Sequence, residues 1–302
     1  MKYYFFIAQL VLAQAAFAQA APPADKASLL SDGSGSRLLR APLASQDPAP
    51  PAFTSSSSGG FIEAVLIANG KFTIGTVAGD PSKTSDDNKD LIYGHPNPGT
   101  SDTMIKVDGV SSSIHSGLSS GVTASGDSLS VTLTIGSIQV LEKLTIKASQ
   151  ATGNKDAVEI YFKVTNAGAG SHTVSLRTQL DTLLGTNDGA PFRIPRVGEV
   201  TKDLEFDNDP ATPAIGDIPA QALVMDNLTA PNIIALLTFT DLGYVKPDRV
   251  VFGYWPASVG AWDYTVDPTR SFLDNNGDGV ISGNSPDSDS VAKKLKCHDW
   301  KK

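Results

Sequence analysis

The chain has 302 residues, and its 32 acidic and 24 basic residues give it a formal net charge of −8. This charge argues against a nucleic-acid partner, because binding to a phosphate backbone relies on lysine and arginine, and it favours cations as ligands. The chain contains one cysteine, Cys297, so an internal disulfide bond is excluded.

The N-terminus is typical of an export signal. Lys2 is followed by the uncharged run YYFFIAQLVLAQAAFA, which ends in the small-residue pattern Ala16-Phe17-Ala18. Residues 1–18 are therefore predicted to be a signal peptide that is cleaved near Ala18. No later stretch provides the about 20 apolar residues that a membrane-spanning helix needs. We expect a secreted protein that is extracellular, at the cell surface or periplasmic, and the lack of disulfide bonds favours a bacterial source.

A linker is predicted to follow the signal peptide. Residues 19–60 are rich in Pro, Ser, Gly and Ala and show no sustained apolar pattern. Such a composition cannot bury enough apolar surface to offset the entropy lost on ordering. We expect this segment to be disordered and to precede a folded domain of residues 61–302.

The folded domain is predicted to be all-β. Asn69-Gly70 separates two apolar runs, which predicts a hairpin with a two-residue type I′ turn. Apolar and polar residues alternate in several later segments, as in strands with one buried face: SLSVTLTI, AVEIYFKVTN and HTVSLRTQLD. Many short strands without an amphipathic helix predict one large antiparallel β-sandwich. A subdivision near residues 148–156 is the alternative.

The segment LDNNGDGVIS, residues 273–282, predicts a calcium site. Alternating oxygen-bearing residues before a glycine match roughly the first nine positions of an EF-hand loop, but Ser285 stands where the bidentate glutamate belongs. No flanking helices are predicted, so the loop resembles the DxDxDG-type calcium loops of secreted bacterial proteins. The alternative is a solvated polar turn. The predicted ligands are Asp274, Asn276, Asp278, the carbonyl of Val280, Ser282 and Asp287, with Asp289 as an alternative to Asp287.

A second loop with acidic residues follows the strand that ends in Asp181. Asp181 and Asp188 are candidates for a ligand-binding pair, either around a cation or as the acid and base of an enzyme. The simpler interpretation of Asn187-Asp188-Gly189 is an Asx turn, in which an asparagine side chain accepts a hydrogen bond from the backbone.

Aromatic residues gather in FGYWPASVGAWDYTV, which contains Tyr254, Trp255, Trp262 and Tyr264. If Trp255 and Trp262 faced water, they could stack on sugar rings. Packing in the core is the alternative, since large aromatic residues dominate the interiors of sandwiches.

The order of several segments is similar to a β-sandwich region that recurs in uncharacterised bacterial extracellular proteins. These segments are NGKFTIGT, LIYGHPNPGTSDTMIKVDG, VTNAGAGSHTVSLRTQLDTLLGTNDGAPFRIP, VVFGYW and WDYTVDP. The resemblance spans most of residues 61–268 and implies a fold and an extracellular location, but it implies no activity and no catalytic residue.

The expected function is a non-catalytic, calcium-braced β-sandwich with a structural or binding role, and a glycan or another cell-surface component as its partner. The alternative is a carbohydrate-binding module or a carbohydrate-active enzyme. Such an enzyme would need two carboxyl groups about 5 to 10 Å apart, supplied by Asp181 and Asp188, or by one of them with Glu159 or Asp263. The histidines lack the spacing of a paired metal site, and no catalytic residue is assigned.

Overall fold

The computed structural model describes residues 2–12, 52–56, 60–80, 82–149, 152–207, 216–239, 247–254, 262, 266–267, 269 and 293–298. The predicted calcium ligands, from Asp274 to Asp287, lie outside these residues, as does Trp255. Among the described residues no helix has the length and apolar character that a membrane span requires.

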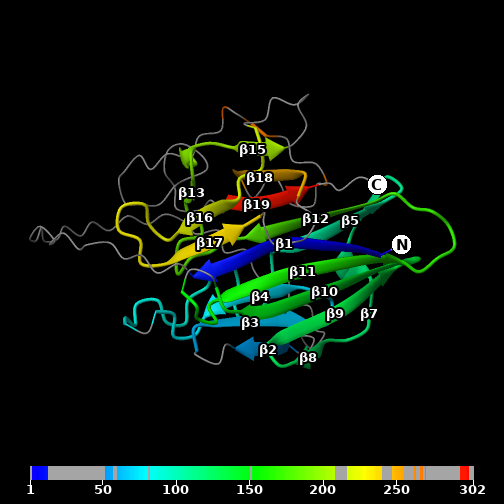
Figure 1. Cartoon of the computed structure of the whole chain (residues 1–302), viewed down its shortest axis with the longest axis horizontal. Helices are drawn as coiled ribbons and strands as arrows, with labels where there is room; N and C mark the ends of the chain where they lie inside the picture. Colours follow the sequence, from blue (N-terminus) through cyan, green and yellow to red (C-terminus); the bar gives the residue numbers. More distant parts are fainter. Residues whose placement is uncertain are drawn as a thin grey trace, which may run out of the picture.

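The described strands form three antiparallel sheets, so the prediction of an all-β protein is confirmed (Figure 1). The first sheet has the order β14 (Gly198–Glu199), β13 (Phe192–Ile194), β16 (Gln221–Met225), β17 (Ile234–Thr238), β1 (Lys2–Leu12), β11 (Ala157–Asn166), β10 (Ile138–Lys147), β9 (Ser128–Ile135) and β7 (Leu118–Ser119), and β8 (Thr123–Ser125) also pairs with β9. The second sheet has the order β15 (Leu204–Asp207), β18 (Arg249–Tyr254), β19 (Lys293–His298), β12 (Val174–Asp181), β5 (Asp102–Val107) and β6 (Val110–Ser113). The third sheet consists of β2 (Ala52–Ser56), β3 (Ile62–Ile67) and β4 (Phe72–Thr76).

Two strands fall within the segments that were expected to be signal peptide and linker. β1 lies between β11 and β17 and pairs antiparallel with both. β2, near the end of the expected linker, pairs with β3 over residues 52–56. The remainder of the linker, apart from Gly60, is outside the described residues.

β9 and β11 follow the alternation predicted from the sequence. On β9 the side chains of Leu129, Val131 and Leu133 are buried, and on β11 those of Val158, Ile160, Phe162 and Val164 are buried. β10 and β11 pair in register from Ile138↔Asn166 to Lys147↔Ala157, so residues 148–156 connect two neighbouring strands.

The β3–β4 hairpin forms where it was predicted, but its turn differs from the predicted type I′. Gly70 N–H donates to the carbonyl of Ile67 at 2.8 Å, and Ile67 N–H donates to the carbonyl of Lys71 at 3.0 Å. The loop is therefore one residue longer, with Gly70 in the left-handed region at a φ of 87°. The side chain of Asn69 accepts a hydrogen bond from Lys71 N–H at 3.1 Å, which stabilises this longer turn.

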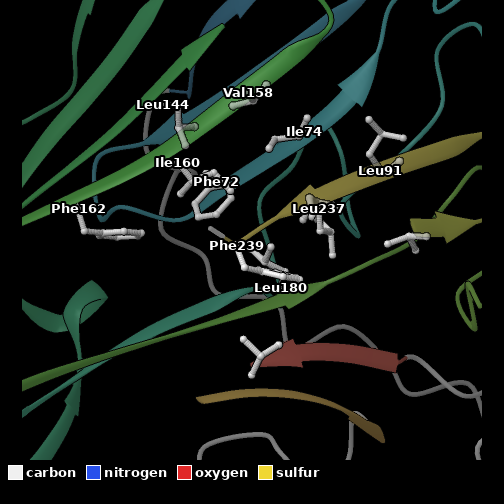
Figure 2. Close-up of a cluster of buried hydrophobic side chains, with 14 of the residues drawn as sticks. Phe72, Ile74, Leu91, Leu144, Val158, Ile160, Phe162, Leu180, Leu237 and Phe239 are labelled. Carbon is white, nitrogen blue, oxygen red and sulfur yellow. The ribbon is translucent and has the colours of Figure 1, made fainter. Parts of the chain in front are cut away.

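One hydrophobic core joins the sheets. Figure 2 shows Phe72 of β4, Leu144 of β10, Phe162 of β11, Leu180 of β12 and Leu237 of β17 directed into the same interior, and all five belong to one buried cluster. These strands come from all three sheets, so burial of apolar surface is the main force that holds the sheets together.

Aromatic side chains link the first and second sheets at one side of this core. The ring of Phe252 on β18 packs edge to face against Phe192 on β13, with the ring centroids 5.0 Å apart. Phe206 and Phe239 pack against the same ring at 6.1 and 6.3 Å. Such edge-to-face pairs add to the stabilisation that burial alone provides.

Candidate functional site

Asp181 joins two segments that are distant in the sequence. Its side chain is 2% exposed, and it accepts a hydrogen bond from the Thr100 hydroxyl. Its backbone N–H donates to the Ser101 hydroxyl at 3.0 Å, and its carbonyl accepts from Tyr93 N–H at 2.8 Å. Asp181 therefore holds residues 93–101 against the end of β12.

Asp188 lies in the turn that the simpler interpretation predicted. Gly189 N–H donates to the side-chain oxygen of Asn187 at 2.9 Å, which is an Asx turn. The side-chain amide of Asn187 also donates to the carbonyl of Asp226 at 2.7 Å, which ties this turn to the loop before β17. The side chain of Asp188 is half-buried in this turn.

Trp262 is buried, with 7% of its surface exposed. The ammonium group of Lys106 on β5 lies 4.3 Å from the centroid of its ring, a cation–π contact. Lys106 pairs with Ser175 near one end of β12, whereas Asp181 is the last residue at the other end. The structure therefore places Trp262 and Asp181 toward opposite ends of the same pair of strands.

Three histidines contact protein groups through both ring nitrogens, and we call them the histidine clasps. In the first clasp, His95 Nε2 lies 3.3 Å from the carboxylate of Glu63 on β3. His95 Nδ1 lies 3.1 Å from the Thr73 hydroxyl on β4. The ring rests on Gly75, where a Cβ atom would overlap it.

Burial shifts the pKa values of His95 and of the nearby Asp90 in opposite directions. It lowers the pKa of His95, although the negative charges of Glu63 and Asp90 act in the opposite direction. Burial raises the pKa of Asp90, although the charge of His95 and backbone N–H groups act against this. Both shifts favour the neutral forms of the two groups.

The second clasp is formed by His115, in the short 3-10 turn η1 (Ile114–Ser116). Its Nδ1 lies 2.9 Å from the carbonyl of Asn69, so Nδ1 must carry a proton. Thr103 N–H donates to Nε2 at 3.2 Å. Nε2 also lies 3.2 Å from the carboxylate of Asp102.

The second clasp brings together a serine, a histidine and an aspartate, but not in the arrangement of a hydrolase. The hydroxyl of Ser113 donates to Asp102 at 2.8 Å instead of to the imidazole ring. A nucleophilic serine would have to donate its proton to the histidine. Burial alone would raise the pKa of Asp102, but His115, the hydroxyl of Ser113 and the charge of Lys71 lower it overall. The ionised form of Asp102 is therefore favoured, and its carboxylate holds the side chains of Ser113 and His115 in place.

The third clasp is more exposed and ties three loops together. His172 Nδ1 lies 2.7 Å from the carboxylate of Asp108, and His172 Nε2 lies 3.1 Å from the hydroxyl of Ser137. The other oxygen of Asp108 accepts from Thr173 N–H at 2.8 Å. His172 and the backbone N–H of Thr173 lower the pKa of Asp108.

Glu142 on β10 is an ionisable residue whose burial was not predicted from the sequence. Its side chain is fully buried, and neither carboxyl oxygen has a hydrogen-bond partner. The signal was present in IQVLEKLTIK, where Glu142 occupies an inward position between Val140 and Leu144 of an otherwise apolar face. Burial of the ionised carboxylate at such a position costs far more free energy than burial of the protonated carboxyl group.

The described ranges contain no group of three or more His, Cys, Asp or Glu side chains that could hold a metal ion. Comparison of the chain with protein-family models gives no match, and comparison with curated proteins gives none either.

Proposed function

We propose that the protein is an exported, non-catalytic β-sandwich with a structural or binding role at the cell surface or in the periplasm, and that calcium braces one of its loops. The histidine clasps are the observation that supports the structural role. His95, His115 and His172 each contact groups of the fold through both ring nitrogens, and these contacts tie loops and strands together.

The contacts of the clasps support a bracing role. Each clasp joins residues that are far apart in the sequence: His95 with Glu63, His115 with Asn69, and His172 with Asp108. A domain without disulfide bonds depends on such contacts to hold its loops, because fixing a loop costs conformational entropy. The calcium site proposed at Asp274, Asn276, Asp278, Val280, Ser282 and Asp287 would brace a further loop in the same way, through carboxylate, carbonyl and hydroxyl oxygens.

Removal of calcium tests this proposal. A ligand that binds only the folded state stabilises it by about 2.7 kcal/mol at 100 times its Kd, so a chelator should lower the melting temperature by several degrees. The double substitution Asp274→Asn and Asp278→Asn should abolish this effect of the chelator. The melting temperature is measured by circular dichroism, with and without EDTA.

The matched control changes the charge equally at two exposed sites, with Glu199→Gln and Asp217→Asn. This control should keep the full response to EDTA. A melting temperature that EDTA does not change in the wild-type chain would contradict the calcium site. A response that persists in the Asp274/Asp278 variant would contradict these ligands.

A further inference from the structure

Glu142 lies inside the first sheet, on β10 between β9 and β11. It pairs with Val131 on β9 and with Phe162 on β11, and both of these side chains are buried. Its own inward neighbours on β10, Val140 and Leu144, are buried as well. The carboxyl group is therefore surrounded by apolar side chains within the sheet.

The β3–β4 turn covers the carboxyl group. A Cβ atom built on Gly70 would lie 2.7 Å from Glu142 Oε2 and 2.6 Å from Leu133 Cδ1. The backbone of the turn thus rests directly on the carboxyl group, and only a residue without a side chain allows this approach.

The ring of His115 contacts the same turn. The Cβ position on Gly70 lies 3.3 Å from His115 Nδ1 and 2.7 Å from Glu142 Oε2, so both side chains approach the same point of the turn. The proton on Nδ1 is donated to the carbonyl of Asn69, which holds the ring against the turn. Asp102 contacts the opposite nitrogen of the ring, away from Nδ1.

Other charged side chains near this position are directed elsewhere. On the turn, the ammonium group of Lys71 donates to the carbonyl of Gly99 at 2.6 Å. On β3, the carboxylate of Glu63 contacts His95. On β10 itself, Lys143 and Lys147 alternate with Glu142 and lie on the opposite face. The inward positions of β9 and β11 hold apolar residues.

We propose that Glu142 is a proton-controlled latch of the β3–β4 turn. In its protonated form the carboxyl group packs beneath Gly70 and keeps the turn seated on β9 and β10. In its ionised form the carboxylate must be hydrated, and opening of the turn that covers it hydrates it at a lower cost in free energy than unfolding of the whole domain. The latch goes beyond the proposed function and does not depend on calcium.

The direction of the pH effect follows from burial. Burial raises the pKa of Glu142 well above its usual value of 4.5. Above pH 4.5 the open or unfolded state therefore releases a proton that the closed state retains. Each further pH unit raises the opening constant about tenfold, until the pKa of the closed state is reached. Opening of one turn requires less free energy than global unfolding, so the turn should respond first.

Hydrogen exchange of the turn amides tests the latch. The amides of Ile67 and Gly70 donate hydrogen bonds within the turn, so their protection reports its closure. In the full chain with excess calcium, their protection, corrected for the intrinsic effect of pH, should fall at least tenfold between pH 5 and pH 8. The amides of β11 serve as the reference, since they should keep their protection.

Three variants complete the test. Glu142→Gln should keep the turn protected at both pH values, and the exposed control Glu199→Gln should behave like the wild-type chain. Glu142→Met, an apolar replacement of similar size, provides a second measurement if the glutamine variant does not fold. Equal loss of protection in the wild-type and Glu142 variants would overturn the latch, and so would full protection of the wild-type turn at pH 8. Because calcium is in excess throughout, either result leaves the calcium proposal unaffected.

Discussion

At the scale of single residues, the polar side chains that interrupt an apolar pattern are the most informative. Glu142 occupies a buried position of β10 whose other buried positions hold aliphatic residues. Gly70 has no side chain, so the β3–β4 turn can approach the carboxyl group of Glu142 closely. The sequence contains both signals, but their relation is a tertiary contact that no local pattern encodes. For the same reason the partners of His95 and His115 could not be predicted, because Glu63, Thr73 and Asn69 are distant in the sequence.

A glycine substitution measures this close approach. Gly70→Ala should destabilise the protein for two reasons: the left-handed φ of 87° and the overlap with Leu133 and Glu142. Gly109 has a φ of 86° and no atom within 4 Å of a built Cβ, so Gly109→Ala carries the backbone strain alone. The strain should cost about 1–2 kcal/mol in the free energy of unfolding, and Gly70→Ala should cost about 1–3 kcal/mol more, through overpacking. Urea denaturation measures both variants, and equal losses would contradict the close packing.

At the scale of strands and hairpins, period-2 alternation predicted β9 and β11 because each has one buried face. The same rule predicted β12 as a strand, but it did not predict that the polar residues of β12 are buried. Its polar residues Arg177, Thr178 and Gln179 are buried together with its apolar ones, because β12 is a central strand covered on both faces. Whether a polar face of a strand is buried depends on the segments that pack over it, and local sequence does not identify these segments. The guanidinium group of Arg177 donates hydrogen bonds to Gln179 and to Met104.

A substitution on β11 tests how far its buried face supports the fold. Phe162 is fully buried in the shared core, so Phe162→Ala should lower the free energy of unfolding by about 3–5 kcal/mol. Thr165 lies on the same strand and is only half-buried, so Thr165→Ala should cost less than about 1 kcal/mol. Chemical denaturation followed by tryptophan fluorescence distinguishes these outcomes. A small loss for Phe162→Ala would mean that the core at this position collapses easily around the missing ring.

At the scale of the whole molecule, strands from distant parts of the chain complete the sheets. β1 occupies the middle of the first sheet, between β11 and β17, and β19 occupies the middle of the second sheet, between β18 and β12. The sequence predicted neither position, because strand order is set by contacts between remote segments. Residues 1–18 also have the features of a signal peptide, and removal of that peptide would remove β1.

This overlap leads to a prediction about processing. If cleavage occurs near Ala18, the backbone groups of β11 that pair with β1 lose their partners along the register Lys2↔Thr165 to Val11↔Ala157. A chain that starts at Gln19 should therefore show faster hydrogen exchange in β11 than the full chain, while β9 should be unaffected. Mass spectrometry of the exported protein identifies its first residue. Identical exchange in β11 for the two chains would contradict a role of β1 in the folded sheet.

The position of β19 has a consequence for the timing of folding. β19 follows every other described strand in the chain, yet it lies between β12 and β18, which each pair with it. The second sheet therefore cannot close while the ribosome is still producing the preceding residues. For the exported chain that we propose, this order of synthesis would keep the second sheet incomplete, and so compatible with transport, until β19 has been made.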